Sequence, residues 1–347
     1  MLNINSRQIL LCFLAAAFLV GCNPPDLEDN NLDESSFIKI TGTPLKIEIL
    51  GVPRITMVDN LILSINQSGK KVFSLIDPNE QKIVNEYGEL NQFPEEYSFP
   101  IFPGEIIPKK PSHFTVHDLD KNEYFEYKLE GNEFELLSKE RINFNGEYFP
   151  NFVGIKSDSL TIYSPEHGGL LVIYKNTPEN ANVIDYFPIP NSEIKDIHKW
   201  MAYQASIAIN LEKKLIAINS LLFGELDIFN FEGELINRVI YDTDNHLSDD
   251  FKAENITATD LKRYAIDIQA SEKSIFILIE GNSYNDIRDK KQIQNSKILE
   301  YDWEGNFING YLLDRPILSI AYDDKNSRIF GTSLIKEEEV IIEFKLN

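Results

Sequence analysis

Short runs in which apolar and polar residues alternate occupy most of the chain, and three of these runs share one kind of turn. They cover residues 124–137, 226–240 and 298–313, and a Glu-Gly pair interrupts each of them. Alternation with a period of two is typical of β-strands that bury one face. Glycine adopts the positive φ angles that tight hairpin turns require. The pattern therefore predicts three β-hairpins of the same kind in an all-β protein.

A second type of strand recurs along the chain at intervals of 46 to 60 residues, about 54 on average. Its six copies begin at residues 61, 114, 160, 215, 275 and 329. A shorter strand rich in small residues precedes them, most clearly at 205–209, 265–269 and 317–321. Units of four short strands repeated in a ring are typical of β-propellers, whose innermost strands crowd around the axis. We therefore predict a six-bladed β-propeller with four-stranded antiparallel blades over residues 37–347.

The last repeat lacks one strand. It supplies strands at 317–321, 329–333 and 340–346, and the sequence then stops. Residues 37–50 precede the first repeat and contain a strand that the first repeat does not need. An open ring would leave an unpaired sheet edge, which natural proteins avoid. We predict that residues 45–50 complete the last blade as its outer strand, and that deletion of residues 37–50 destabilises the whole fold.

The N-terminus carries a pattern for export. Arg7 precedes an apolar stretch over residues 9–20, and the tetrapeptide LVGC ends at Cys22. These features are typical of a secretory signal, and the apolar stretch is too short to cross a bilayer. The tetrapeptide resembles the lipobox of bacterial lipoproteins, which implies that residues 1–21 are removed and that Cys22 becomes the lipid-bearing N-terminus. An ordinary secretory signal that happens to end in cysteine is the alternative.

By the same resemblance, Asn23 after the cysteine favours sorting to the outer membrane, where the protein would face either the periplasm or the cell surface. Residues 22–36 are acidic and almost free of apolar residues, so we predict a disordered tether there. The chain has two cysteines, and Cys12 leaves with the signal. Acylation of Cys22 would leave the mature domain without a thiol, which excludes a catalytic cysteine and a disulfide.

Charge restricts the partners. The formal net charge is −22, and it becomes −23 when Arg7 is removed with the signal. Such a surface repels nucleic acid and anionic lipid. We therefore expect no nucleic-acid partner, a membrane contact only through the N-terminal lipid, and a monomer.

The lipobox and the repeats together point to a known family. Residues 298–313 (ILEYDWEGNFINGYLL) and the strands at 317–333 (ILSIAYDDKNSRIFGTS) show the repeat most clearly. Over residues 40–347 the chain resembles the TolB-like six-bladed propeller lipoproteins of bacteria. The resemblance implies the fold and export, and it implies no known chemistry.

Enzyme motifs are scarce. The sequence lacks G-x-S-x-G, H-E-x-x-H, P-loop and G-x-G-x-x-G patterns. His113 and His117 are four apart on one expected strand, about 13 Å from each other, which is too far to share a metal. His167 in the segment SPEHGG is more typical of a turn, although a binding role stays open. Calcium-dependent propeller hydrolases need several carboxylates on the innermost strands, and here only Asp267 and Asn151 offer oxygen ligands. We expect no cofactor, with Ca²⁺ as the alternative.

The best candidate site is the mouth of the central channel. Arg263 and Arg315 each stand just before an innermost strand of adjacent repeats, and Arg54 begins the innermost strand of the first repeat. Aromatic residues such as Trp200 and Tyr264 lie in the loops expected on that face. Guanidinium groups beside aromatic rings suit a carboxylate, phosphate or sugar ligand. The alternative is that these arginines pair with neighbouring acidic groups, for instance Arg315 with Asp314.

Two functional hypotheses follow. The first is a lipid-anchored, non-catalytic binding module of the cell envelope that recognises a glycan, a peptide or a protein on the loop face of the propeller. The second is an envelope hydrolase, similar to lactonases, that uses a divalent cation in the central channel. We favour the first because the innermost strands offer few metal ligands.

Overall fold

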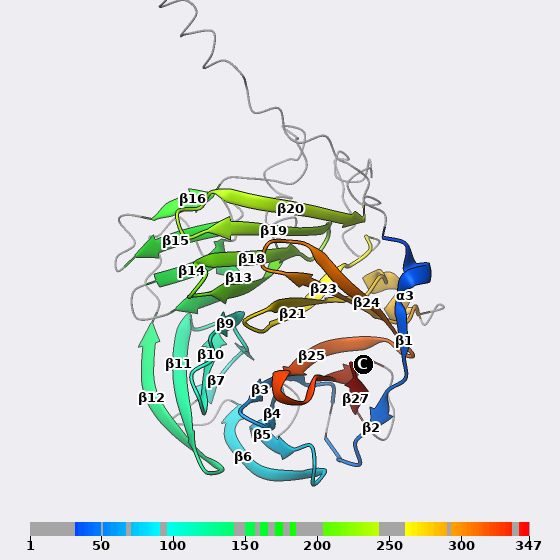
Figure 1. The fold of residues 1–347 in the computed structure, drawn as a ribbon. Helices are drawn as coiled ribbons and strands as arrows, with labels where there is room; N and C mark the ends of the chain where they lie inside the picture. Colours follow the sequence, from blue (N-terminus) through cyan, green and yellow to red (C-terminus); the bar gives the residue numbers. More distant parts are fainter. Residues whose placement is uncertain are drawn as a thin grey trace, which may run out of the picture.

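The computed structural model is a ring of six small β-sheets, the blades, around a central axis (Figure 1). It describes residues 32–49, 51–66, 71–90, 96–141, 150–156, 160–165, 171–175, 181–184, 204–242, 261–289, 293–334 and 340–346. The six-bladed propeller predicted from the repeats is confirmed. No helix within these ranges is both long and apolar enough to cross a membrane.

The first three blades follow one another along the chain. Blade 1 consists of β3 (Arg54–Val58), β4 (Leu61–Ile65), β5 (Lys71–Asp77) and β6 (Lys82–Leu90), with the short β7 (Glu96–Tyr97) parallel to β6 at its edge. Blade 2 consists of β8 (Pro100–Ile101), β10 (His113–Asp118), β11 (Glu123–Glu130) and β12 (Glu133–Arg141). Blade 3 consists of β13 (Pro150–Lys156), β14 (Leu160–Pro165), β15 (Leu171–Lys175) and β16 (Asn182–Ile184).

The last three blades each take a strand from elsewhere in the chain. Blade 4 consists of β17 (Ala205–Asn210), β18 (Leu215–Ser220), β19 (Gly224–Asn230) and β20 (Leu235–Asp242), with β9 (Glu105–Ile107) beside β17. Blade 5 consists of β21 (Ala265–Ala270), β22 (Ser274–Ile279), β23 (Lys297–Asp302) and β24 (Phe307–Leu313), with β1 (Ile38–Ile40) beside β24. Blade 6 consists of β25 (Ile317–Asp323), β26 (Arg328–Ser333), β27 (Ile341–Lys345) and β2 (Thr43–Pro44).

Local sequence explains the turns and the few helical residues. The three Glu-Gly hairpins are β11–β12, β19–β20 and β23–β24, and their glycines have positive φ angles: 65° at Gly131, 84° at Gly233 and 86° at Gly305. One α-helix, α3 (Tyr284–Arg288), begins at a capping box in which Ser283 and Asp286 bond each other's backbone. Two 3-10 turns, η1 (Glu34–Ser36) and η5 (Asp324–Asn326), complete the described elements.

The N-terminal segment closes the ring, as the missing strand predicted, but the strand is shorter and lies earlier. The strand β2 pairs antiparallel with β27, and the amide of Leu45 extends the pairing to the carbonyl of Ile341 at 2.8 Å. Residues 45–49 are not a strand, so the predicted bounds of 45–50 are wrong. Their alternation instead buries Leu45 and Ile47 between blades 6 and 1. The parallel β1 adds a fifth strand to blade 5, which the sequence did not indicate.

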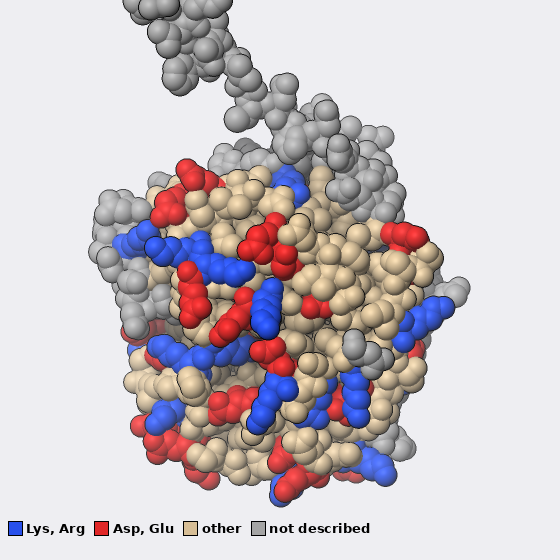
Figure 2. All heavy atoms as spheres, in the orientation of Figure 1, with Lys and Arg blue, Asp and Glu red and all other residues tan. Residues whose placement is uncertain are grey.

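Apolar clusters join neighbouring blades. In the described part of the chain, five such clusters connect blades 1 and 2, 3 and 4, 4 and 5, 5 and 6, and 6 and 1. Burial of apolar side chains is worth about 1.5–3 kcal/mol for each large residue, so these clusters dominate the stability of the ring. Acidic and basic side chains lie interspersed over the face shown in Figure 2.

Candidate functional site

The two faces of blade 2 differ in polarity. One face packs against blade 1 through apolar residues, among them Phe114, Val116 and Phe125. Because neighbours on a strand point to opposite sides, the other face points toward blade 3. Two cross-strand rows of that face read Thr115–Glu126–Ser138 and His117–Tyr124–Glu140. The face of blade 2 toward blade 3 therefore carries hydrogen-bonding and ionisable groups where the other blade junctions carry apolar side chains.

A long connection between two strands of blade 2 reaches the innermost strand of blade 4. Residues 102–112, the strap, join β8 to β10, whereas four residues separate β17 from β18 and three separate β21 from β22. The strap contains β9, which pairs in parallel with the innermost strand of blade 4. Glu105 of β9 is 10 % exposed at its side chain and accepts a hydrogen bond from Thr56 of blade 1 at 3.1 Å. The strap thus ties blades 1, 2 and 4 together near the axis.

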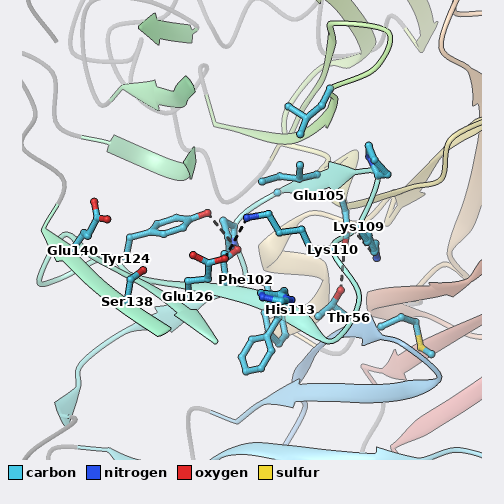
Figure 3. A pocket seen from close by; sticks show the side chains of 18 residues that line it. Thr56, Phe102, Glu105, Lys109, Lys110, His113, Tyr124, Glu126, Ser138 and Glu140 are labelled. Atoms are coloured by element: carbon cyan, nitrogen blue, oxygen red, sulfur yellow. Dashed lines mark hydrogen bonds and ion pairs between the residues drawn. The ribbon is translucent and has the colours of Figure 1, made fainter. Parts of the chain in front are cut away.

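A cavity of about 330 Å³ lies between the strap and the polar face of blade 2 (Figure 3). Its walls come from the strap, from β10, β11 and β12, from β3 of blade 1, and from the residue that follows β17. The polar and aromatic side chains that line it include, in chain order, Thr56, Phe102, Glu105, Lys109, Lys110, His113, Thr115, Tyr124, Glu126, Ser138 and Glu140. A concave site with aromatic walls and a few converging polar groups is the usual form of a ligand-binding site.

Two lysines and three glutamates line the cavity, and each lysine pairs with one of the glutamates. Lys109 bonds Glu105 at 2.8 Å, and Lys110 reaches Glu126 at 3.5 Å from a side chain that is 64 % exposed. The Tyr124 hydroxyl donates to Thr115 at 3.3 Å. Figure 3 shows Tyr124, Glu126 and Lys110 pointing toward one another across the cavity. The site offers hydrogen-bond donors and acceptors at fixed positions, and its lining contains one carboxylate more than ammonium groups.

A buried histidine lies beside the cavity. His117 is fully buried next to the ring of Tyr124, with 6.0 Å between ring centroids. Neither ring nitrogen finds a hydrogen-bond partner among the described residues. Burial lowers the pKa of His117 to about 4, against a smaller opposing effect of Asp118. His117 is therefore neutral at physiological pH. His113, at the start of the same strand, instead donates from Nδ1 to the carbonyl of Pro111 at 2.7 Å.

The structure brings Arg54 and Arg263 together at the opposite end of the innermost strands. Arg54 donates to the carbonyls of Ile266 in blade 5 and Leu318 in blade 6, at 3.1 and 3.0 Å. Arg263 forms an ion pair at 2.5 Å with Glu280, whose side chain is fully buried. Burial raises the pKa of Glu280, and both arginines oppose that shift. The positive charges at this end of the axis thus already have partners within the protein.

Arg315 bonds its neighbour in the sequence. Its guanidinium bonds both carboxylate oxygens of Asp314 at 3.1 Å. Asp314 also accepts from the backbone of Gly42, and the hydrogen bonds to Arg315 and to this backbone hold its pKa below the usual range although burial opposes them. Pairing of these arginines with acidic neighbours was the alternative stated above, and it describes the observed contacts of Arg263 and Arg315. Their role toward a ligand stays a prediction.

The remaining predicted site residues divide into buried and undescribed ones. Tyr264 is 2 % exposed and donates from its hydroxyl to Asp242 at 2.8 Å. Asp267, considered above as a metal ligand, accepts from Ser319 and from the amides of Ile268 and Ile320. No group of three or more His, Cys, Asp or Glu residues in the described ranges is placed to hold a metal ion. Cys22, His167 and Trp200 lie outside the described residues, as does the side chain of Asn151.

The cavity was not predicted from the sequence, although the chain carries a signal for it. The strap and its flanks read FPIFPGEIIPKKPSHF, with four prolines and two adjacent lysines in 16 residues. This segment falls between the first and second strands of a repeat, where the other repeats have short turns. A long loop in a compact domain is commonly functional. The length of this connection, compared with its equivalents, would have indicated the site.

Comparison with known proteins supports the fold. A family model described as TolB-like 6-blade propeller-like matches residues 43–325. Among solved structures of the same fold, a member of the DUF4221 family from Bacteroides vulgatus has a TM-score of 0.54 at 9 % identity, covering 89 % of this chain and 97 % of that one. A Bacteroides fragilis protein described as exported has a TM-score of 0.53 at 11 % identity, covering 91 % and 97 %. No curated protein sequence matches the chain.

Proposed function

The chain belongs to the TolB-like six-bladed propeller family, and on that premise we propose that it is an exported, lipid-anchored binding module of the bacterial cell envelope. The observation that carries the binding role is the cavity on the polar face of blade 2. Tight apolar packing at blade junctions stabilises a propeller. A junction face with polar side chains and a cavity contributes less to stability, which is typical of a functional site. The ligand is a glycan, a peptide or a protein segment that enters this cavity.

Substitution of a cavity residue tests the binding role. Ser138 lines the cavity on β12, and its neighbour Leu137 lies on the same strand, is 43 % exposed, and does not line the cavity. Ser138→Trp should fill the cavity, whereas Leu137→Trp adds the same side chain beside it and serves as the matched control. The chain from residue 22 with Cys22→Ser would be titrated calorimetrically with a panel of oligosaccharides and short peptides.

We expect at least one class of the panel to bind the parent and Leu137→Trp, and to lose at least tenfold in affinity with Ser138→Trp. Equal binding by both tryptophan variants, or no binding by any class, would refute a ligand site in this cavity. Melting temperatures of the variants show whether a lost affinity reflects lost folding.

The anchor is proposed from the lipobox resemblance and is supported by the export ascribed to the Bacteroides fragilis protein of the same fold. Residues 23–31 separate Cys22 from the first described residue and span at most about 30 Å when extended. Several acyl chains on one residue bind a membrane stably. The propeller would therefore stay within a few tens of ångströms of the lipid surface.

Replacement of the acylated residue tests the anchor. Cys22→Ser should move the protein from the membrane fraction to the soluble periplasmic or extracellular fraction, and it should abolish incorporation of labelled palmitate. Asn23→Gln retains the cysteine and is the control. Continued membrane association of Cys22→Ser would contradict the lipid anchor, and it would leave the proposed binding role of the cavity unaffected.

A further inference from the structure

We infer that the cavity ligand is an uncharged sugar unit of a glycan, held by the strap and by the polar face of blade 2. This inference rests on the binding role proposed above and adds the chemical class of the ligand. Three features of the cavity carry it: the internal pairing of its charges, its supply of hydroxyl groups, and its aromatic walls.

Internal charge pairing disfavours a charged ligand. Lys109 pairs with Glu105 and Lys110 with Glu126, so each cation of the strap already has a carboxylate. The carboxylates already neutralise the lysine charges, so an anionic ligand would meet no net positive charge and would lie beside the carboxylates of Glu105 and Glu126, which is unfavourable. Repulsion is strongest at Glu105, whose side chain is only 10 % exposed. A cationic ligand would lie beside the ammonium groups of Lys109 and Lys110 in the same way.

An uncharged polyol can bind without breaking these pairs. A carboxylate has about four acceptor positions and an ammonium group has three donors, so one mutual bond leaves most of this capacity open. The free acceptor positions of Glu126 can receive two neighbouring sugar hydroxyls, and the Lys110 ammonium can donate to a sugar oxygen. Hydrogen bonds to ionised groups are stronger than those between neutral groups, which favours such contacts.

The other walls match both faces of a sugar ring. Thr115 and Ser138 present hydroxyls, which can donate and accept as sugar hydroxyls do, and the Thr56 hydroxyl, which donates to Glu105, can still accept. Phe102 and Tyr124 provide aromatic walls, on which the C–H face of a pyranose ring can pack. A volume of about 330 Å³ lies at the lower end of the range for small-ligand sites. The cavity therefore suits one or two sugar units, such as the end of a longer chain.

A titration with neutral and charged probes tests the inference. The probes are the methyl glycosides of glucose, galactose, mannose and N-acetylglucosamine with their disaccharides, glucuronic acid as an anion, glucosamine as a cation, and dipeptides as zwitterions. We expect the tightest binding from a neutral sugar, with an affinity that changes less than twofold between 50 and 500 mM NaCl, because no net charge is exchanged.

The matched variants are Glu126→Gln and Glu135→Gln. Both residues lie on the blade 2 face toward blade 3, but Glu135 stands in the next row, opposite Lys128, and does not line the cavity. Glu126→Gln should weaken binding of the neutral sugar by at least tenfold, while Glu135→Gln should stay within twofold of the parent.

The outcomes separate this inference from the proposed function. Tighter binding of glucuronic acid, glucosamine or a dipeptide, lost in Ser138→Trp, would overturn the assignment to an uncharged sugar and leave the binding role intact. Sugar binding that is equal in Glu126→Gln and Glu135→Gln would place the sugar elsewhere and overturn the inference. Binding of no probe would count against both.

Discussion

Two side chains with shifted pKa values make opposite contributions to the pH dependence of stability. Burial lowers the pKa of His117 in blade 2 from 6.5 to about 4, so the unfolded chain binds a proton between these values and the native protein does not. Burial raises the pKa of Asp267 in blade 5 from 3.8 to about 6, so there the native protein binds the proton more tightly. From pH 4 to 6, His117 makes the free energy of unfolding rise with pH, and Asp267 makes it fall. The two effects largely cancel in the parent protein.

Replacement of His117 should reveal its contribution. His117→Phe keeps a ring of similar size in a fully buried position and removes two nitrogens that lack partners among the described residues. We expect the free energy of unfolding to increase by about 1–3 kcal/mol at pH 7.5, the cost of an unsatisfied buried polar group. The increase should be larger at pH 5, because the unfolded parent also binds a proton at His117 there. Urea unfolding at both pH values measures it. A uniform loss of stability at both pH values would show that His117 has a partner in the ring.

Asp267 should make the free energy of unfolding depend on pH in the opposite direction. Asp267→Asn cannot ionise, so the difference in free energy of unfolding between parent and variant should favour the parent most at pH 4 and least at pH 7. The variant also replaces one acceptor oxygen by an NH₂ group, which removes either the acceptor for Ser319 and the Ile320 amide or the acceptor for the Ile268 amide and lowers its stability at every pH. The change with pH is therefore the diagnostic quantity. A pH-independent difference would mean that Asp267 keeps its ordinary pKa in the folded protein.

At the scale of elements, the Glu-Gly hairpins do more than turn the chain. An asparagine in the outer part of one blade donates its amide to the hairpin turn of the next blade, each time at 2.7 Å. The bonds are Asn85 to the Asn132 carbonyl, Asn182 to the Glu232 carbonyl, and Asn237 to the Glu304 carbonyl. The same kind of hydrogen bond therefore forms at three blade junctions, between blades 1 and 2, 3 and 4, and 4 and 5. The turn sequence serves the neighbouring blade as well as its own.

A pair of glycine substitutions separates these two roles. A Cβ at Gly305 would lie 2.6 Å from the Asn237 amide nitrogen, whereas a Cβ at Gly131 would meet no heavy atom within 4 Å. Both glycines have positive φ, so alanine costs about 1–2 kcal/mol at either position. Gly305→Ala also disturbs the bond from Asn237, for a total of about 2–3 kcal/mol. Denaturant unfolding measures the difference.

The background of Asn237→Ala provides the control for this comparison. Without the asparagine amide, Gly305→Ala should cost no more than Gly131→Ala, because only the backbone strain remains. Equal costs of the two glycine variants in the parent would show that the contact between blades 4 and 5 contributes nothing to stability.

At the scale of the whole molecule, segments from distant parts of the chain hold the ring together. The strand β1 joins blade 5, β2 joins blade 6, and Leu45 and Ile47 pack between blades 6 and 1. Arg54 of blade 1 bonds carbonyls of blades 5 and 6 near the axis. Closure therefore depends on the N-terminal segment at the rim and on one arginine at the centre.

Deletion of residues 37–50 should destabilise the entire ring. The loss of several buried apolar side chains, each worth about 1.5–3 kcal/mol, should lower the melting temperature by more than about 10 °C. Deletion of residues 23–31 is the control and should leave the melting temperature unchanged. Differential scanning calorimetry compares the two. Melting of the 37–50 deletion within 2 °C of the parent would disprove closure by this segment.

The sequence by itself determined the all-β class, the number of blades and the positions of most strands. Each of these follows from local causes: alternation with a period of two, glycine at the hairpin turns, and repeats of nearly constant length. It also indicated that the N-terminal segment completes blade 6. It missed the bounds of that strand because alternation in residues 45–49 marks burial between blades as readily as pairing within one.

Only the tertiary structure decided where the cavity lies and which charges pair. The strap binds β17 about 100 residues further along the chain, with Glu105 opposite Ala208, and no local pattern specifies so distant a partner. A polar strand face has the same pattern whether it meets solvent or a neighbouring blade, so the role of blade 2 was hidden in its sequence. Likewise, the arginines before the innermost strands could bind a ligand or an acidic neighbour. Their partners, such as Glu280 for Arg263, became visible only when the blades were assembled.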